Sequence, residues 1–199
     1  MNTMNVNVYD NKIFAPLKHG TRFLSKIFPT HTHANTSNVN KECAFLPPKN
    51  PIWCIYRDPM EHLVSALHSE IITMDTYGDL TISDVMNKFT QLEGSMHWNK
   101  DILKDLYYTW DKVHKNGFNI VELKELSNLL IELGYNVPEY DYEEFQFHHM
   151  RSWISKEDII SMVQTDFPKE WEYLMSIVES ENEFYYKLNN KIRIPIKFV

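Results

Sequence analysis

Two short stretches of the sequence carry residue types that can bind anions at a strand-to-helix junction. In the first, KHGTR, Lys18 and Arg22 supply positive charge and Thr21 supplies a hydroxyl. Gly20 lets the backbone approach a ligand closely, because it has no side chain. An amphipathic stretch follows, so we expect the amides of this loop to lie at a helix N-terminus, where partial positive charge favours phosphate. The alternative is an ordinary turn with a solvated lysine.

The second stretch, IYRDPMEHLVSALHS, holds Arg57 and Ser65 eight positions apart. The apolar run IWCIY before Arg57 is typical of a strand that is buried on both faces. Asp58 can cap the helix that follows, and Pro59 suits its first turn. Ser65 would then lie about two turns into the helix, so that its hydroxyl and the Arg57 guanidinium could bind one phosphate. The alternative is an Arg–Asp pair at the surface beside a helix-surface serine.

Apolar periodicity and turn residues predict the strands and helices around these two stretches. We expect strands at 12–17, 52–56 and 118–123, each leading into a helix. The polar segment THTHANTSNVNKE, 30–42, is predicted to be a loop. Helices are expected at 23–28, from 59 to beyond 71, at about 83–92, at about 101–115, at 124–133, and as a pair over 155–180 interrupted near Pro168.

This alternation predicts a single helix-rich α/β domain over residues 1–199, with three layers and a mainly parallel central sheet flanked by helices. In such sheets ligands bind outside the carboxyl ends of the strands. We therefore expect the functional residues directly after Leu17, Tyr56 and Leu123. That rule places KHGTR and Arg57 at the same edge of the sheet.

The composition limits the partners of the chain. With 27 acidic and 20 basic residues, the 199-residue chain has a net charge of −7, which argues against a nucleic-acid or anionic-membrane binder. No window is apolar enough for a membrane span, and the N-terminus lacks the apolar region of a signal peptide. Cys43 and Cys54 have no metal-ligand spacing. We expect both to be reduced thiols in a cytoplasmic protein without a metal site. The oligomeric state is left open.

Taken together, the two motifs resemble those of the sulfotransferases that use 3′-phosphoadenosine 5′-phosphosulfate (PAPS) as donor. KHGTRFL resembles the 5′-phosphosulfate loop of the family, in the version of the heparan glucosamine enzymes, and Arg57 with Ser65 resembles its 3′-phosphate motif. The resemblance covers residues 12–28, 50–72 and 117–134 and implies the P-loop-like sulfotransferase fold. A P-loop kinase, the competing nucleotide enzyme, would need G-x-x-x-x-G-K-[ST], which does not occur.

The resemblance implies in-line transfer of a sulfuryl group from PAPS to a hydroxyl or amine of a saccharide or small metabolite, without a metal. The product nucleotide would be 3′-phosphoadenosine 5′-phosphate (PAP). By the same resemblance, Lys18 would stabilise the leaving oxygen, since positioning and electrostatic stabilisation dominate such reactions. The loop from Lys18 to Arg22, with His19 in a slot that the family usually fills with a small residue, would hold the 5′-phosphate. Arg57 and Ser65 would hold the 3′-phosphate.

An acceptor hydroxyl also needs a general base. The glucosamine enzymes carry a glutamate on the first helix, where this chain has Ser25 and Lys26. Other family members use a histidine from the following segment, so the resemblance points to His31 and His33, with His97 of the dipeptide HW as a further candidate. The missing glutamate also favours an alternative function, a catalytically inactive module that binds PAPS or another nucleotide. Binding without turnover would distinguish that module from an enzyme.

Overall fold

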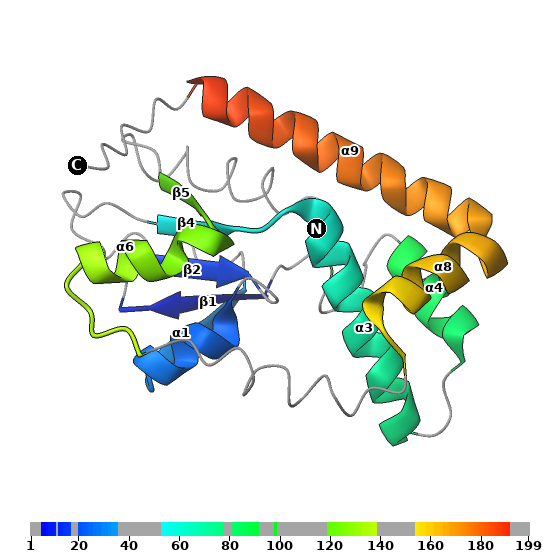
Figure 1. The fold of residues 1–199 in the computed structure, drawn as a ribbon, viewed down its shortest axis with the longest axis horizontal. Helices are drawn as coiled ribbons and strands as arrows, with labels where there is room; N and C mark the ends of the chain where they lie inside the picture. The colour runs from blue at the N-terminus through cyan, green and yellow to red at the C-terminus, as the bar shows by residue number, and fades with distance from the viewer. Residues whose placement is uncertain are drawn as a thin grey trace.

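The computed structural model describes residues 5–10, 12–16, 20–35, 53–77, 81–91, 98, 119–138 and 154–191. Five strands of this part form one sheet in the order β3-β1-β2-β4-β5, and helices flank it (Figure 1). The prediction of a helix-rich α/β protein is therefore confirmed at this level.

The sheet is mixed, which corrects the prediction of a mainly parallel one. β2 (Ile13–Pro16), β4 (Trp53–Tyr56) and β5 (Asn119–Glu122) run parallel, as predicted. β1 (Asn5–Tyr9) pairs antiparallel with β2 on one side and with β3 (His31–Asn35) on the other. Strands joined by a short turn can only pair antiparallel, because a parallel pair needs a long crossover. The hairpin of β1 and β2 therefore sets this part of the sheet.

The prediction missed the strands β1 and β3. β1 alternates asparagine with valine, a pattern typical of a strand, whereas β3 has the polar sequence HTHAN, which is not. The prediction of a loop is wrong for His31–Asn35, which pairs along its whole length with β1. The ladder of backbone hydrogen bonds is open to any residue except proline, and an edge strand tolerates polar side chains because one side faces away from the sheet.

One face of the sheet is covered by α1 (Thr21–Ile27) and α6 (Leu126–Glu132), which follow β2 and β5. A short 3₁₀ turn, η1 (Leu123–Glu125), joins β5 to α6, and Gly134 ends α6 with a left-handed φ of 84°. The apolar side chains between these helices and the sheet form what we call the sheet core, which comprises Tyr9, Ile13, Ala15, Phe23, Leu24, Phe28, Ile55, Val121, Leu126, Leu129 and Leu130.

A second group of helices builds a separate core beside the sheet (Figure 1). It consists of α3 (Pro59–Tyr77), α4 (Ile82–Thr90), α8 (Lys156–Asp166) and α9 (Pro168–Lys191), close to the predicted positions. The helix predicted at about 101–115 lies outside the described residues. The helical core, as we call it, comprises Leu63, Ala66, Leu67, Ile71, Val85, Met86, Phe89, Trp98, Ile154, Ile159, Val163, Leu174 and Val178.

Side-chain caps fix where three of these helices begin. The carboxylate of Asp58 accepts a hydrogen bond from the Glu61 amide at 3.0 Å, so the predicted cap of α3 is confirmed. Thr81 forms a capping box with Asp84 at the start of α4. Ser155 accepts the Asp158 amide at 3.0 Å before α8. The break predicted near Pro168 is also present, because α9 begins at that residue.

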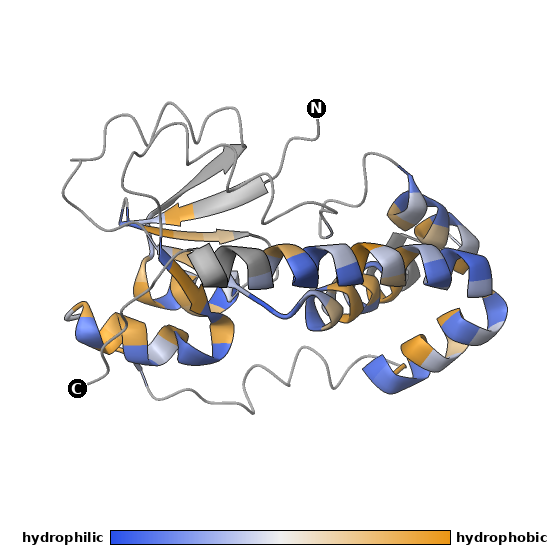
Figure 2. Ribbon diagram, turned by 90° about the horizontal axis from the view of Figure 1, so that it is seen from above, coloured by the Kyte–Doolittle hydropathy of each residue, from blue (hydrophilic) through white to orange (hydrophobic). Residues whose placement is uncertain are grey.

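The helices α3 and α9 connect the two cores. In Figure 1, α3 lies between the sheet and the other helices, and α9 runs from α8 to the side of β5. Figure 2 shows hydrophilic and hydrophobic residues alternating along this longest helix. Its inward residues Leu174 and Val178 belong to the helical core, whereas Tyr185 reaches the sheet and stacks on Tyr56. Neither α9 nor any other described helix is apolar enough to cross a membrane.

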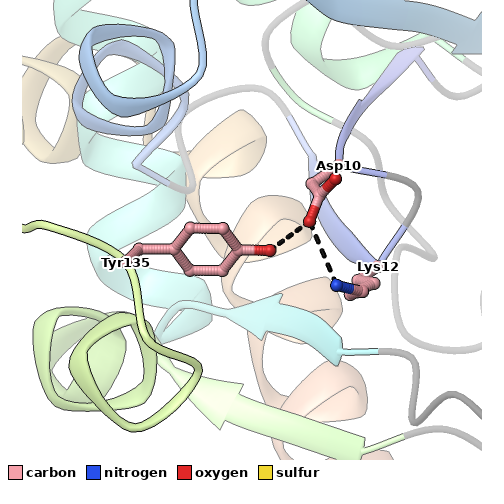
Figure 3. A network of polar contacts seen from close by, with 3 residues as sticks. All are labelled: Asp10, Lys12 and Tyr135. Carbon is pink, nitrogen blue, oxygen red and sulfur yellow. Dashed lines mark hydrogen bonds and ion pairs between the residues drawn. The ribbon is translucent and has the colours of Figure 1, made fainter.

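The hairpin between β1 and β2 is tied to the end of α6 by a polar cluster (Figure 3). The Tyr135 hydroxyl donates to the Asp10 carboxylate, and Lys12 Nζ lies 3.2 Å from Asp10 Oδ2. The hydrogen bond from Tyr135, more than the ammonium of Lys12, lowers the pKa of Asp10. The Tyr135 ring meets Phe28 edge-on at a centroid distance of 4.8 Å. This cluster lies at the amino edge of the parallel strands, because β2 begins directly after the turn.

Cys54 lies on β4 and is 1% exposed. Burial alone raises the pKa of its thiol to about 12, so the sulfur stays protonated near neutral pH. The thiol is free, as predicted for a reduced cysteine. Cys43 lies outside the described residues.

Candidate functional site

Three strand-to-helix junctions lie at the carboxyl edge of the parallel strands. β2 leads to Gly20, β4 leads to Arg57, and β5 leads to Leu123. A Cβ atom placed on Gly20 would lie 2.7 Å from Cδ1 of Leu123 and 3.1 Å from Cδ2 of Leu126, so the junctions after β2 and β5 are in contact. Gly20 also has a left-handed φ of 77°. Only glycine satisfies both the conformation and the space at this position.

The start of α1 is fixed by hydrogen bonds to the Thr21 carbonyl. The Tyr9 hydroxyl donates to that oxygen at 3.0 Å, and the Ser25 hydroxyl donates to it at 2.8 Å. The hydroxyl of Ser25 is therefore engaged with the backbone of its own helix. The side chain of Arg22 is exposed at the beginning of the helix.

Arg57 lies directly after β4, as predicted, and its side chain is 15% exposed. Its Nε atom lies 3.5 Å from Oε2 of Glu61, a carboxylate that is 67% exposed. The Asp58 carboxylate, the partner that the alternative gives to Arg57, accepts the Glu61 amide and caps α3. The arginine side chain is therefore largely buried, whereas the carboxylate that pairs with it is largely exposed.

Ser65 lies on α3 at a position that is 9% exposed. This burial differs from the alternative of a helix-surface serine. Arg57, Glu61 and Ser65 follow one another at intervals of four residues, so Glu61 stands one helical turn before Ser65 on the same side of α3. Arg57 itself precedes the helix, and its contact with Glu61 brings the guanidinium to the first turn of α3.

The remaining predicted site residues are distributed as follows. Lys18, His19 and His97 lie outside the described residues, so their roles stay predictions. His31 and His33 lie on β3, which is separated from β2 by β1. The backbone of His31 is level with the beginning of β2, at the amino edge of the parallel strands, and His33 lies two positions nearer the carboxyl edge.

Trp98, the second residue of the dipeptide HW, is 1% exposed in the helical core. Its ring lies 5.1 Å from that of His62 on α3, measured between centroids. The sequence left open whether this tryptophan shapes an acceptor pocket or is structural, and its complete burial identifies a structural contribution.

The prediction from sequence missed four polar residues near the carboxyl edge. Tyr56 stacks on Tyr185 with centroids 4.0 Å apart and rings inclined by 6°. The Tyr185 hydroxyl donates to Oε1 of Glu122 at 3.2 Å, and Glu181, one turn earlier on α9, is 7% exposed. A signal was present in the sequence. The inward stripe of α9 runs through Leu174, Val178, 181 and 185, and it changes from apolar to polar where the helix leaves the helical core.

The hydroxyl of Tyr56 stays protonated at any physiological pH. Burial raises its pKa most strongly, and the nearby Asp58, Tyr185, Glu181 and Glu122 raise it further because each repels a phenolate. Tyr56 can therefore donate a hydrogen bond at this edge but cannot act as a base.

Charges of both signs lie at the carboxyl edge. Arg57 faces Glu61, and Lys124 Nζ lies 2.6 Å from Oε2 of Glu122. Both ion pairs have one strongly exposed partner, Glu61 in the first and Lys124 in the second. Such pairs are worth about 0–1 kcal/mol, so an incoming anion can separate them at little cost.

Comparisons of the chain with protein-family models, with curated proteins and with solved structures gave no match. The site therefore has to be interpreted from its own geometry and from the motifs in the sequence.

Proposed function

We propose that the protein is a sulfotransferase that uses PAPS as donor and modifies a hydroxyl or amine of a saccharide or small metabolite. One observation carries this proposal. The junctions that hold Gly20 and Arg57 follow neighbouring parallel strands, so both lie at one edge of the sheet, and α3, which carries Ser65, begins directly after Arg57. A ligand with two phosphate groups about one nucleoside apart matches two such junctions.

The described residues support the donor site in distinct ways. The backbone at Gly20 is left-handed and tightly packed, so the loop before α1 has a fixed end. Arg57 is mostly buried and therefore pre-positioned for a charge-assisted fork to a phosphate. Ser65 adds a hydroxyl from the same side of α3. In this proposal the arginine and the serine bind the 3′-phosphate, the contact that would select PAPS over ATP.

The chemistry rests on residues of the loop and on a base. In the proposal Lys18 stabilises the negative charge that develops on the leaving oxygen, and the loop amides hold the 5′-phosphate. The general base is proposed among His31, His33 and His97, with His33 nearer the carboxyl edge than His31. Ser25 cannot replace the missing glutamate, because a serine hydroxyl bound to a carbonyl is no base near neutral pH.

That same observation at Ser25 favours the second candidate function, a module that binds PAPS or a related nucleotide without turnover. The two functions share the donor site and differ only in the base. Binding of the nucleotide therefore tests both, and release of PAP from PAPS in the presence of an acceptor separates them.

The first test is a calorimetric titration of the protein with PAP, with ATP and AMP as controls. We expect micromolar affinity for PAP and much weaker binding of ATP and AMP, because neither control carries a 3′-phosphate. A preference for ATP, or no binding of PAP, would contradict the donor site.

Substitutions at Arg57 then show whether the 3′-phosphate is bound where we propose. Arg57→Ala is expected to weaken PAP binding by roughly 30- to 800-fold, which corresponds to about 2–4 kcal/mol. Arg57→Lys should weaken it less, because it keeps the charge and loses the fork. Lys88→Ala removes one positive charge from α4 in the helical group and serves as the matched control. An equal loss in Lys88→Ala would mean that only the net charge of the protein matters.

The role of Lys18 is tested by turnover. Lys18→Ala should reduce the rate of sulfuryl transfer far more than it reduces PAP affinity, because its contribution is proposed for the transition state. The rate is measured with excess PAPS and an acceptor identified by screening saccharides and hydroxylated metabolites. Equal losses of rate and affinity would assign Lys18 to ground-state binding alone.

A further inference from the structure

The carboxylate of Glu61 adds a negative charge beside the arginine that is proposed to bind a phosphate. Glu61 stands one turn before Ser65 and its Oε2 lies 3.5 Å from Arg57 Nε, so a carboxylate borders the place proposed for a phosphate. Two like charges at such a separation repel each other, and the repulsion is strongest where the surroundings exclude water. A phosphate that forms a fork on Nε and one Nη atom of Arg57 therefore needs the side of the guanidinium that Glu61 occupies.

We propose that Glu61 is an internal competitor for Arg57, which the 3′-phosphate of the donor must displace. This inference rests on the proposed function and names a residue that sets the affinity and selectivity of its phosphate site. The competition disfavours a singly charged group at this position, which would replace one negative charge with another and gain nothing. A terminal phosphate with two negative charges gains more from the guanidinium than Glu61 does.

The burial of the two partners decides which of them moves. Arg57 is 15% exposed and is held by the surrounding protein, whereas Glu61 is 67% exposed and lies in the first turn of a helix. The backbone of Glu61 is fixed by the bond of its amide to Asp58, so displacement requires only a rotation of the side chain. Glu61 can therefore swing into the solvent while Arg57 stays in place.

Glu61 could in principle have the opposite role and orient Arg57 for the phosphate. If Glu61 served to orient Arg57, its removal would weaken phosphate binding. The high exposure of the carboxylate argues against this role, because a weak exposed pair does not fix a side chain that is already buried.

The experiment measures PAP affinity by calorimetry for the wild type, Glu61→Gln and Glu61→Asp. We expect both variants to bind PAP more tightly, by roughly two- to fivefold for the loss of one exposed ion pair. Glu61→Asp keeps the charge and shortens the side chain by one methylene, so it loses the contact alone. Glu132→Gln on α6 is the control for net charge and should change the affinity less than about twofold, the scale of a distant, screened charge.

AMP provides the second readout, because it has no 3′-phosphate to compete with Glu61. Its affinity should be the same in the wild type and in Glu61→Gln. Unchanged or weaker PAP binding in Glu61→Gln would overturn the inference and leave the donor site intact. Tightening in Glu61→Gln without tightening in Glu61→Asp would also overturn it, in favour of a through-space charge effect. If no variant binds PAP, the proposed function itself fails.

Discussion

The interiors of the sheet core and the helical core differ from the boundary between them in the kind of side chain that is buried. The interiors of both cores are apolar. Among the described residues, the buried polar side chains lie on only two helices, with His62, Ser65 and His68 on α3 and Glu181 on α9. These are the two helices that connect the cores.

Burying a polar group costs free energy unless it is hydrogen-bonded, so such groups are concentrated where they have a task. His68 has a structural one, because its Nε2 atom lies 3.2 Å from the Ile154 carbonyl and ties α3 to the start of α8. Ser65 lies one turn earlier on α3 and thus nearer the carboxyl edge and Arg57. The comparison therefore indicates that each core is a scaffold and that the boundary between them holds the candidate site.

The largest loss of stability is expected from a cavity in the interior of one core. Leu67→Ala empties a fully buried position in the helical core and should lower the free energy of unfolding by about 2–5 kcal/mol. Urea titration followed by circular dichroism measures the change. Ile131→Ala, at a position that is 61% exposed, is the control and should cost less than about 0.5 kcal/mol.

Leu130→Ala makes the same truncation in the sheet core, where Leu130 is fully buried. If the connecting helices make the two cores one cooperative unit, each variant unfolds in a single transition that circular dichroism and tryptophan fluorescence report identically. Separate transitions in Leu67→Ala would show instead that the helical core can open alone.

A smaller effect is expected at the contact between the junctions of β2 and β5. Gly20→Ala should lower stability by about 2–4 kcal/mol, because the new methyl group meets Leu123 and the left-handed conformation becomes strained. It should also weaken PAP binding. Gly134→Ala has the same sign of φ and nothing within 4 Å of the new atom, so it should cost only about 1 kcal/mol. Equal losses of stability in the two variants would mean that the contact with Leu123 does not contribute to the loss.

The connection of α9 to the sheet is the next test. Tyr185→Ala removes the stack on Tyr56 and should cost about 1–2 kcal/mol, whereas Tyr185→Phe keeps the ring and should cost about 0.5–1 kcal/mol for the lost hydrogen bond to Glu122. Thermal unfolding by calorimetry distinguishes the two. A loss of stability in Tyr185→Phe as large as that in Tyr185→Ala would mean that the hydroxyl of Tyr185, and not its stacked ring, connects α9 to the sheet.

The smallest effect concerns the amino edge and appears as a dependence on pH. The folded pKa of Asp10 lies below its unfolded value, so its contribution to stability is present above about pH 4 and is lost as the pH falls through the folded pKa. Tyr135→Phe removes the main cause of that shift. The variant should therefore lose less stability than the wild type between about pH 4 and pH 2. Parallel curves of stability against pH would contradict this role of Tyr135.

The sequence predicts the parts of the fold whose pattern is local. Apolar runs locate β2, β4 and β5, and Asp58, Pro168 and Gly134 mark the ends of helices through their own backbone chemistry. The strand β1 was missed although its alternation of asparagine and valine is a local strand signal, whereas β3 is polar and depends on its pairing with β1. The parallel and antiparallel parts of the sheet could not be separated for the same reason.

The candidate site divides in a similar way. Gly20, Arg57 and Ser65 are found from the sequence because a strand end and a helix start make their positions foreseeable. The pair of Arg57 with Glu61 was also accessible, since acidic and basic residues four apart are neighbours along a helical line. For Tyr185 and Glu181 the sequence shows only that the inward stripe of α9 becomes polar, and the packing of α9 across both cores decides that they reach the sheet.

Cys54 allows the opening of the central strand to be measured. Only the thiolate reacts with alkylating reagents, and in the folded protein the thiol is 1% exposed with its pKa raised to about 12, so labelling requires β4 to open. In a Cys43→Ser background the labelling rate therefore reports the free energy of that opening, provided that reclosing is faster than reaction. A nucleotide bound where β4 ends should slow the labelling in proportion to its saturation. A buried sulfur without a role in the proposed chemistry can thus measure ligand affinity through the kinetics of its own protection.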